Sequence, residues 1–261
     1  MRVAILIPAR YASTRYPGKP LVELRGPDGS KSLIRRSWEA AQAAAGVMDH
    51  DVAVHVLTDD DRIKDHAEAF GASVLMTGEA ANGTERCADA LARHGLDVDV
   101  VVNLQGDAPL TPPGFVTALV DGMGDAAVAT PVLRCDETTY RHFREDRAAG
   151  RVGGTTAVFG DGGRALYFSK EVVPYLSDAA VAAGGWRDVF HHVGLYAYAP
   201  EALQAYAGLA PGILERHEGL EQLRFLEHGW PVACVEVDAG GRVFWELNNP
   251  ADVARIEEVL G

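Results

Sequence analysis

The feature that most constrains the fold is a regular alternation of apolar runs and helix-periodic segments over the first hundred residues. The apolar runs have the length and β-branched content of strands, and the segments between them carry apolar residues at helical spacing. The predicted strands span residues 3–7, 52–57, 73–76 and 98–104, and the predicted helices span 33–45, 63–70 and a segment opening around Thr84. This order predicts a Rossmann-like α/β fold with a mainly parallel, doubly wound sheet.

The pattern changes after residue 131, where shorter apolar runs are separated by polar or glycine-rich connections. We expect strands at 155–159, 165–168 and 193–198, and we interpret residues from about 132 to 200 as an inserted β-rich layer. The remaining predicted elements are a helix at 218–227, strands at 232–237 and 243–247, and a helix at 250–260. Because no linker, repeat or low-complexity tract interrupts the chain, we expect one domain over residues 1–261.

The charge and the cysteine content argue against several classes of protein. The 261 residues are 48% hydrophobic and carry a formal net charge of −13, whereas a broad nucleic-acid or membrane surface needs clustered Lys and Arg. Cys87, Cys135 and Cys234 lie far apart, without the spacing of a zinc site or a disulfide framework. The first apolar run is too short for a signal peptide or a membrane span. We therefore expect a soluble cytoplasmic protein without nucleic-acid or membrane partners.

A cationic loop follows the first predicted strand, at the strand end where ligands bind in such sheets. It begins at Pro8 and Ala9 and contains Arg10, Arg15 and Lys19. These cations and the backbone donors of the loop suit the phosphates of a nucleoside triphosphate. The loop lacks the leading glycine and the Ser or Thr after Lys that define a Walker A motif. The alternative interpretation is a solvated basic loop.

Asp107 is the best candidate for a metal ligand. The predicted strand 98–104 delivers Gln105 and Asp107 to the same sheet edge as the cationic loop. A carboxylate there suits Mg²⁺ bound to a triphosphate, and the amide of Gln105 suits the edge of a base or sugar. The alternative is that Asp107 is a turn residue or a helix cap, which is common after a strand.

A third candidate lies at the predicted helix start around Asn82 and Gly83. The N-terminus of a helix attracts anions because its first N–H groups have no partner within the helix. Arg86 lies one turn further on and adds a positive charge. The alternative for this motif is a capped helix with a surface ion pair.

Together these motifs resemble the CMP-KDO synthetases, the 3-deoxy-manno-octulosonate cytidylyltransferases. The resemblance covers nearly the whole chain through IPARYASTRYPGKPL at 7–21, NGTERCADAL at 82–91, VNLQGDAPL at 102–110, ALYFSK at 165–170, HHVGLYAY at 191–198 and LEQLRFLEHG at 220–229. It implies a nucleotide-diphospho-sugar-transferase-like α/β fold, transfer of CMP from CTP to a small anionic acceptor with release of pyrophosphate, and usually a homodimer. The segment at about 132–200 is then expected to bind the acceptor and to mediate dimerisation.

The resemblance also implies roles for single residues. It implies that Arg10, Arg15 and Lys19 bind the CTP phosphates, that Asn82, Gly83 and Gln105 contact the nucleotide, that Asp107 binds Mg²⁺, and that His192, Tyr196, Glu221 and Gln222 lie in or beside the acceptor site. We add Pro8, Ala9 and Arg86 to the nucleotide contacts, and Lys170, His191, Arg216 and, more weakly, Arg187 to the acceptor contacts. Lys19, Arg10 and Asp107 are the predicted catalytic residues.

Four departures from the family pattern bear on the metal and the acceptor. Ala108 replaces the Glu of Gly-Asp-Glu-Pro, and Asn248 aligns with the Asp of Val-Asp-Thr-Pro that is a second metal ligand in the family. The neutral carbonyl of Asn248 is a weaker ligand for Mg²⁺ than a carboxylate. His191 and Lys170 each replace an Arg where the sugar acid is expected to bind.

These departures suggest an acceptor that is already ionised. The hydroxyl through which KDO attacks must lose a proton, and a weaker metal site slows that step. A phosphonate oxygen is anionic near neutral pH, and relatives of the family attach CMP to phosphonates such as phosphonoformate. We therefore expect a phosphonate acceptor, with KDO as the alternative. A further alternative is a non-catalytic nucleotide-binding relative.

Overall fold

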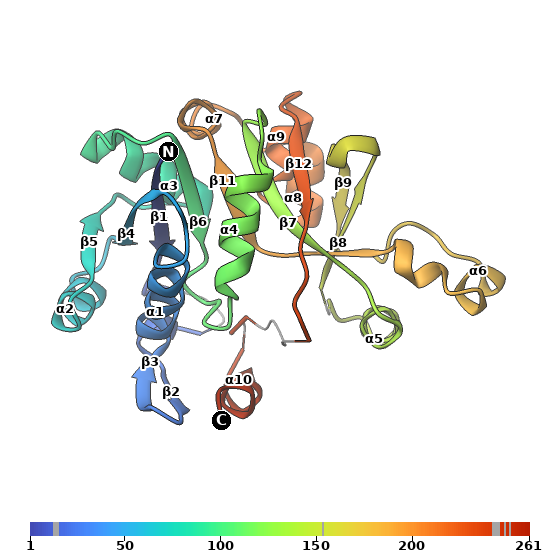
Figure 1. The fold of residues 1–261 in the computed structure, drawn as a ribbon, viewed down its shortest axis with the longest axis horizontal. Coiled ribbons are helices and arrows are strands. Elements are labelled where there is room, and N and C mark those ends of the chain that lie inside the picture. Colours follow the sequence, from blue (N-terminus) through green and yellow to red (C-terminus); the bar gives the residue numbers. More distant parts are fainter. Residues whose placement is uncertain (13–15, 153, 242–245, 248, 251) are drawn as a thin grey trace.

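The computed structural model describes residues 1–12, 16–152, 154–241, 246–247, 249–250 and 252–261. Its centre is a ten-stranded sheet in the order β5-β4-β1-β6-β11-β7-β10-β8-β9, with β12 paired to β7 (Figure 1). The strands are β1 Arg2–Pro8, β4 Asp51–Thr58, β5 Ser73–Met76, β6 Val100–Leu104, β7 Val128–Arg134, β8 Thr155–Phe159, β9 Ala165–Ser169, β10 Phe190–His192, β11 Leu195–Tyr198 and β12 Val232–Glu236.

Helices cover both faces of this sheet. They are α1 Leu33–Ala45, α2 Asp61–Ala69, α3 Gly83–His94, α4 Pro113–Gly122, α5 Glu137–Ala148, α6 Asp178–Ala182, α7 Pro200–Tyr206, α8 Ile213–Glu218, α9 Leu223–Glu227 and α10 Asp252–Leu260. A separate hairpin of β2 Glu23–Gly26 and β3 Gly29–Ser32 shares an apolar cluster with α10. None of the helices among the described residues is both long and apolar enough to cross a membrane.

The N-terminal half of the sheet is parallel, as the sequence predicts. Strand β1 pairs in parallel with β4 and β6, and β4 pairs in parallel with β5. Alternate residues of β1 enter opposite cores: Ile5 and Ile7 pack with α1, α2 and α4, while Leu6 packs with α3, α7 and α9. The carboxyl ends of β1, β4 and β6 therefore meet at one edge, which positions the polar loops that follow them.

The C-terminal half corrects one expectation. The β-rich segment is not an added layer, because its strands continue the central sheet in antiparallel register. Strands β10 and β11 are separated only by Val193 and Gly194, and both pair with β7. Strand β11 also pairs with β6, and so it lies in the centre of the sheet beside the parallel half. This places His192 and Tyr196 next to the end of β6.

Two further predictions differ from the structure. The predicted helix at 218–227 is helical only in its second half, as α9, because Gly219 adopts the left-handed conformation with φ +63° and ends the preceding helix α8 at Glu218. Of the predicted strand at 243–247, residues 242–245 lie outside the described residues, and residues 246–247 are not in a strand.

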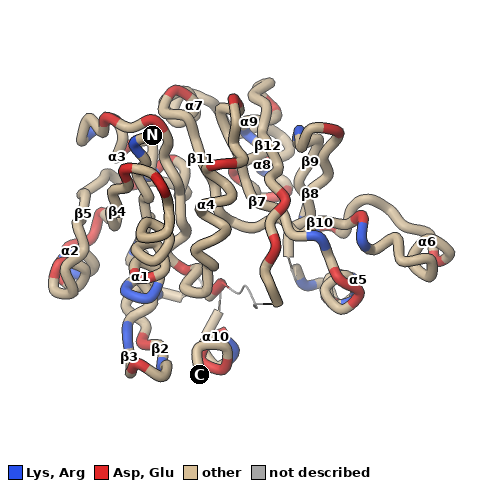
Figure 2. Tube along the Cα trace, viewed as in Figure 1, with Lys and Arg blue, Asp and Glu red and all other residues tan. Residues whose placement is uncertain are grey.

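An arm that carries α5 and α6 extends beyond the end of the sheet formed by β8 and β9 (Figure 1). Cys135, Tyr140, Phe143 and Val189 form its buried apolar cluster. Figure 2 shows acidic residues distributed over most elements of the chain, in keeping with its net charge of −13. All three cysteines are buried and unpaired.

Candidate active site

The loop after β1 begins beside β4 and ends in a short helical turn. The N–H of Ala9 donates to the carbonyl of Leu57 at 2.8 Å, which fixes the start of the loop at the sheet edge. Gly18 adopts φ +69° and precedes the 3₁₀ turn Lys19–Leu21. This turn carries Lys19 back toward the sheet. Arg10 is exposed at the start of the loop, and Arg15 lies outside the described residues.

Lys19 and Asp107 form the centre of the site. The Nζ of Lys19 donates to Oδ2 of Asp107 at 2.5 Å and to the carbonyl of Leu247 at 3.0 Å. The N–H of Leu247 in turn donates to the carbonyl of Asp107 at 2.8 Å. Only 18% of the Lys19 side chain and 24% of the Asp107 side chain are exposed. The structure thus brings together two predicted catalytic residues that lie 88 positions apart in the sequence.

Gly106 allows the loops after β1 and β6 to lie against each other. A Cβ atom on Gly106 would lie 2.6 Å from the carbonyl oxygen of Pro8, closer than atoms can pack. The hydroxyl of Ser37 donates to the carbonyl of Gly106 at 3.0 Å and fixes the turn from the side of α1. Pro8, Gly106 and Asp107 are consequently held in one rigid arrangement.

The start of α3 lies beside Gln105. The side chain of Asn82 accepts a hydrogen bond from the N–H of Glu85 at 2.8 Å and so caps the helix. A Cβ on Gly83 would lie 3.1 Å from Nε2 of Gln105 and 3.2 Å from Nδ2 of Asn103. Asn82, Gly83 and Gln105 therefore form one neighbourhood at the ends of α3 and β6.

Arg86 is bound to protein groups rather than directed at an open surface. Its side chain is 3% exposed, donates to Oγ1 of Thr77 at 2.5 Å and forms an ion pair with Asp59 at 3.2 Å. These contacts hold α3 against the segments that follow β4 and β5. The buried guanidinium of Arg86 therefore helps to hold α3 in place. Contact of Arg86 with the nucleotide stays a prediction.

Tyr196, Gln222 and His192 come together on the face of the sheet that α3 and α9 cover. The Tyr196 hydroxyl donates to Oε1 of Gln222 at 3.1 Å, and the rings of His192 and Tyr196 lie 5.6 Å apart. Nε2 of His192 lies 3.0 Å from the hydroxyl of Thr130. Burial, and then the neighbouring His191, lower the pKa of His192 to about 3. His192 is therefore a neutral hydrogen-bonding group at physiological pH.

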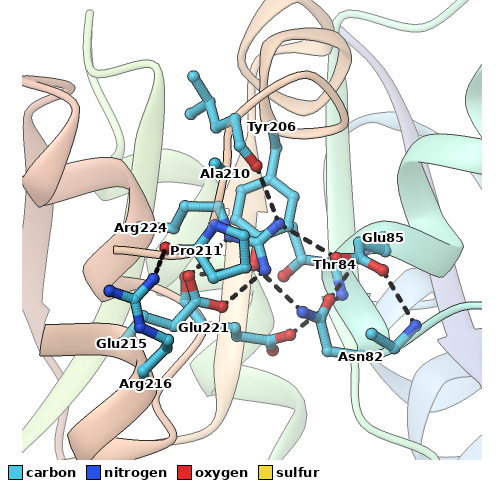
Figure 3. A network of polar contacts seen from close by, with 12 residues as sticks. Asn82, Thr84, Glu85, Tyr206, Ala210, Pro211, Glu215, Arg216, Glu221 and Arg224 are labelled. Atoms are coloured by element: carbon cyan, nitrogen blue, oxygen red, sulfur yellow. Dashed lines mark hydrogen bonds and ion pairs between the residues drawn. The ribbon is translucent and has the colours of Figure 1, made fainter. Parts of the chain in front are cut away.

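Glu221 joins this group to the N-terminus of α3. Its Oε2 accepts a hydrogen bond from the N–H of Thr84 at 3.3 Å, and the hydroxyls of Thr84 and Tyr198 lie 2.8 Å apart. Figure 3 shows Glu221 among Asn82, Thr84 and Arg224. Burial of its carboxyl raises the pKa of Glu221 to about 7, even though the Thr84 N–H favours the charged form. Glu221 can consequently exchange a proton near neutral pH.

Three other predicted acceptor contacts have protein partners of their own. His191 adjoins His192 in β10 and so faces the opposite side of the sheet, where its ring packs against Phe143 at 5.1 Å. The N–H of Lys170 donates to Glu218 at 2.9 Å. Arg216 is exposed, and its guanidinium donates to the carbonyl of Pro211 at 2.6 Å (Figure 3). The guanidinium of Arg187, the weaker candidate, lies 4.0 Å from the ring centroid of Trp186 in the arm.

Arg224 is a supporting residue that the sequence analysis missed. Its guanidinium donates to both carboxylate oxygens of Glu215 at 2.7 and 2.6 Å, pairs with Glu85 at 3.1 Å and lies 4.2 Å from the ring centroid of Tyr206 (Figure 3). It thereby connects α8, α9 and the first turn of α3. The sequence does hold a sign of this role, because Arg224 stands among the apolar residues of α9. An Arg in an apolar stretch predicts a buried ion pair when a carboxylate is near.

Comparison with known proteins identifies the family. A model of the cytidylyltransferase family matches residues 4–236. The 3-deoxy-manno-octulosonate cytidylyltransferase of Maricaulis maris is 39% identical over the whole chain and 97% of its own length. The chain belongs to the CMP-KDO synthetase family. It is therefore a nucleotidyltransferase, so the interpretation as a non-catalytic relative is not supported.

Other family members and solved structures agree with this assignment. The 8-amino-3,8-dideoxy-manno-octulosonate cytidylyltransferase of Shewanella pealeana is 38% identical over the whole chain and 99% of its own length. The structure of a CMP:2-keto-3-deoxy-manno-octonic acid synthetase complexed with CTP superposes with a TM-score of 0.82 at 31% identity, covering 100% of this chain and 98% of that chain. The predicted fold class is confirmed. These relatives are named for sugar acids, so the comparisons do not support the expected phosphonate acceptor.

Proposed function

We propose that this cytidylyltransferase transfers CMP from CTP to a 3-deoxy-2-keto sugar acid of the KDO type and releases pyrophosphate. The single observation that carries the proposal is the similarity over the full chain to enzymes named for KDO or its 8-amino derivative. The relative solved with CTP supports CTP as the donor. The neutral His192 and the hydroxyl of Tyr196 beside the carboxyl of Glu221 suit a polyhydroxylated acceptor.

We also propose Mg²⁺ as the cofactor, with Asp107 as its ligand from the protein. Asp107 would supply one carboxylate from the end of β6, and its side chain is 24% exposed. This fits Mg²⁺, which commonly takes one or two carboxylates and completes its shell with substrate phosphates and water. A metal ion held by Asp107 would supply charge neutralisation for the triphosphate and Lewis acidity toward the attacking hydroxyl. Asn248, the second predicted ligand, lies outside the described residues.

The contact between Lys19 and Asp107 indicates how the chain prepares this site. The ammonium of Lys19 neutralises the Asp107 carboxylate and is held in place by the carbonyl of Leu247. When the triphosphate arrives, Lys19 exchanges this carboxylate for a phosphate oxygen, which frees Asp107. Lys19 and Arg10 then offset negative charge as the acceptor oxygen attacks in line and pyrophosphate leaves.

A phosphonate acceptor is a second candidate because of Ala108. In the family pattern this position is a glutamate next to the metal ligand, whereas here it is a buried methyl group with 2% exposure. Removal of a carboxylate lowers the negative charge near Asp107, and a dianionic acceptor is then repelled less. This argument concerns one position, whereas the similarity to the KDO enzymes extends over the whole chain.

Pyrophosphate release with a panel of acceptors tests the proposal. The purified protein is incubated with CTP, Mg²⁺ and either KDO, 8-amino-KDO or phosphonoformate, and Asp107→Asn serves as the control without the carboxylate. We expect turnover with KDO or its 8-amino derivative and none with Asp107→Asn. Turnover with phosphonoformate alone would contradict the KDO proposal and favour the second candidate.

The homodimer is likewise our proposal. The arm and the adjoining edge of the sheet expose several large apolar side chains, including Tyr175 at 87%, Leu166 at 62% and Val152 at 51%. Apolar groups on an extended arm favour association with a second copy of the chain. Light scattering on the purified protein measures the mass, and a monomer at micromolar concentration would contradict the proposal.

A further inference from the structure

The side-chain amide of Asn82 is held by protein groups at both of its ends. The N–H of Glu85 is a donor, so the Asn82 atom that it contacts at 2.8 Å is the amide oxygen. The amide nitrogen therefore points the other way, and it donates to the hydroxyl of Tyr206 at 3.2 Å. Because the neighbouring Gly83 lies beside Gln105, this orientation sets which groups the start of α3 presents to the nucleotide.

Arg224 holds both of the residues that hold Asn82. Its Nη1 donates to Oε1 of Glu85 at 3.1 Å, and its Cζ lies 4.2 Å from the ring centroid of Tyr206 (Figure 3). Two hydrogen bonds to Glu215, at 2.7 and 2.6 Å, fix the other side of the guanidinium. A planar guanidinium can serve two carboxylates and stack on a ring at the same time, whereas an ammonium group cannot.

Tyr206 is a rigid and neutral partner for the amide. Its side chain is fully buried, and its ring packs against Phe225 at a centroid distance of 4.9 Å. Burial raises the pKa of Tyr206, and the nearby Glu221 carboxyl raises it further, so the phenol keeps its proton at neutral pH. The hydroxyl donates this proton to the backbone carbonyl of Glu221 at 3.4 Å and accepts from Asn82.

The start of α3 suits the nucleoside part of CTP better than its phosphates. The N–H of Thr84 donates to the carboxyl of Glu221, and the N–H of Glu85 donates to Asn82, so two of the first N–H groups already have protein acceptors. The Glu221 carboxyl, when ionised, also repels an anion at this position. The neutral amides of Asn82 and Gln105 match the polar edge of a base or sugar instead.

We propose that Tyr206 and Arg224 are positioning residues that orient Asn82 toward the nucleoside part of CTP. Tyr206 holds the amide nitrogen of Asn82 directly, and Arg224 acts through Glu85 and Tyr206. The inference rests on the proposed function, since it takes CTP as the donor and places it against Asn82. It gives a role to Tyr206, which lies outside every segment of the family resemblance.

Calorimetric titration with CTP and Mg²⁺, without an acceptor, tests the inference. Tyr206→Phe removes only the hydroxyl and keeps the ring that packs on Arg224. Tyr140→Phe is the matched control, because its hydroxyl contacts Arg144 at 3.0 Å in the arm. We expect Kd for CTP to rise about 3- to 10-fold in Tyr206→Phe, as for one lost hydrogen bond, and less than about 2-fold in Tyr140→Phe. An unchanged Kd in Tyr206→Phe would overturn the inference.

Inorganic tripolyphosphate separates local positioning from a general loss of structure. It carries the charges of the CTP phosphates and lacks the nucleoside, so its Kd is expected to be the same for wild type and Tyr206→Phe. Equal weakening of CTP and tripolyphosphate would overturn the inference, because the variant would then disturb the whole site.

A double-mutant cycle tests whether Tyr206 acts through Asn82. Asn82→Ser keeps a helix cap and removes the amide. In that background Tyr206→Phe is expected to change Kd for CTP by less than about 2-fold. The same effect in both backgrounds would show that Tyr206 acts by another route and would overturn the inference.

Arg224→Lys tests the second positioning residue. It keeps the positive charge and loses the planar group, so Kd for CTP is expected to rise and Kd for tripolyphosphate to stay unchanged. A folded Arg224→Lys with the wild-type Kd for CTP would overturn the role of Arg224. If this variant does not fold, Glu85→Gln tests the same contact at its exposed end, with the same expected result and the same contradicting one.

Failure of the proposed function gives a different result. If wild type binds no CTP, the proposed donor is wrong and the inference fails with it. If wild type binds CTP but does not turn over KDO, only the proposed acceptor is wrong, because the titrations contain no acceptor. If wild type turns over KDO and Kd for CTP is the same in every variant, only the roles of Tyr206 and Arg224 are wrong.

Discussion

Replacing Glu221 by Gln is predicted to change how the stability of the protein depends on pH. The carboxyl of Glu221 helps to raise the pKa values of the buried Tyr196 and Tyr198, and burial raises its own pKa from 4.5 to about 7. Gln has nearly the same shape and can still accept the hydrogen bond from the N–H of Thr84. The variant therefore removes the titration and keeps the contact.

The sign and size of the effect follow from the two pKa values. Below pH 4.5 the carboxyl is protonated in both the folded and the unfolded chain, so its titration has no effect on stability. Between pH 4.5 and about 7 only the unfolded chain loses the proton, so the folded state is progressively destabilised as pH rises. One pKa unit corresponds to about 1.4 kcal/mol, which gives a full effect of about 3 kcal/mol and about 2.5 kcal/mol between pH 5 and pH 8.

Urea denaturation of both proteins at pH 5, 6, 7 and 8 measures this difference. The free energy of unfolding of Glu221→Gln minus that of wild type is expected to rise by about 2 to 2.5 kcal/mol from pH 5 to pH 8. Other titrating groups contribute equally to both proteins and cancel in the difference. Two profiles that stay parallel over this range would show that the Glu221 carboxyl is already ionised at pH 5, which would refute the reasoning.

Two further substitutions and one titration give distinct expected outcomes. Lys19→Met is expected to lower kcat by about 100-fold or more, measured by pyrophosphate release, because the phosphates and Asp107 lose their shared cation; an unchanged kcat would contradict this role. Gly106→Ala is expected to lower the free energy of unfolding by about 1–3 kcal/mol, whereas Gly114→Ala, which meets nothing within 4 Å, is not; equal values would argue against the close approach. The pKa of His192 is lowered to about 3, so the neutral ring contributes stability above pH 6.5 that is lost as pH falls toward 3. An NMR titration measures this pKa, and protonation of the ring near pH 6 would contradict its burial.

Much of the fold followed from periodicity. Helix α1 and the strands β5 and β8 have the predicted bounds because their apolar spacing is strong and local. The break between α8 and α9 depends on the left-handed conformation of Gly219, which a helical pattern of apolar residues does not indicate. The apolar runs after residue 131 predict an inserted β-rich layer but not its antiparallel pairing with the central sheet, because strand pairing is a long-range property that single strands do not encode.

The candidate site was also only partly predictable, because some of its contacts depend on strand order and others on long-range pairing. The rule that ligands bind at the carboxyl ends of parallel strands brought Lys19, Asp107 and Gln105 to one edge without knowledge of the pairing. The contact of Leu247 with Asp107 joins residues 140 positions apart through backbone groups, which carry no side-chain signal. The opposite orientation of His191 and His192 follows from their being neighbours in a strand, once that strand is known. The Mg²⁺ dependence, the homodimer and the cytoplasmic location stay predictions.

The measurement that tests the central claim most directly is a competition between two acceptors in one reaction. CTP, Mg²⁺ and equal concentrations of KDO and phosphonoformate are incubated with the protein, and the products are separated and measured by ³¹P NMR. The product ratio equals the ratio of the two kcat/KM values. The account predicts a product with a single phosphorus, in which CMP is linked to the sugar acid. A dominant product with two coupled phosphorus signals, from CMP linked to the phosphonate, would contradict it.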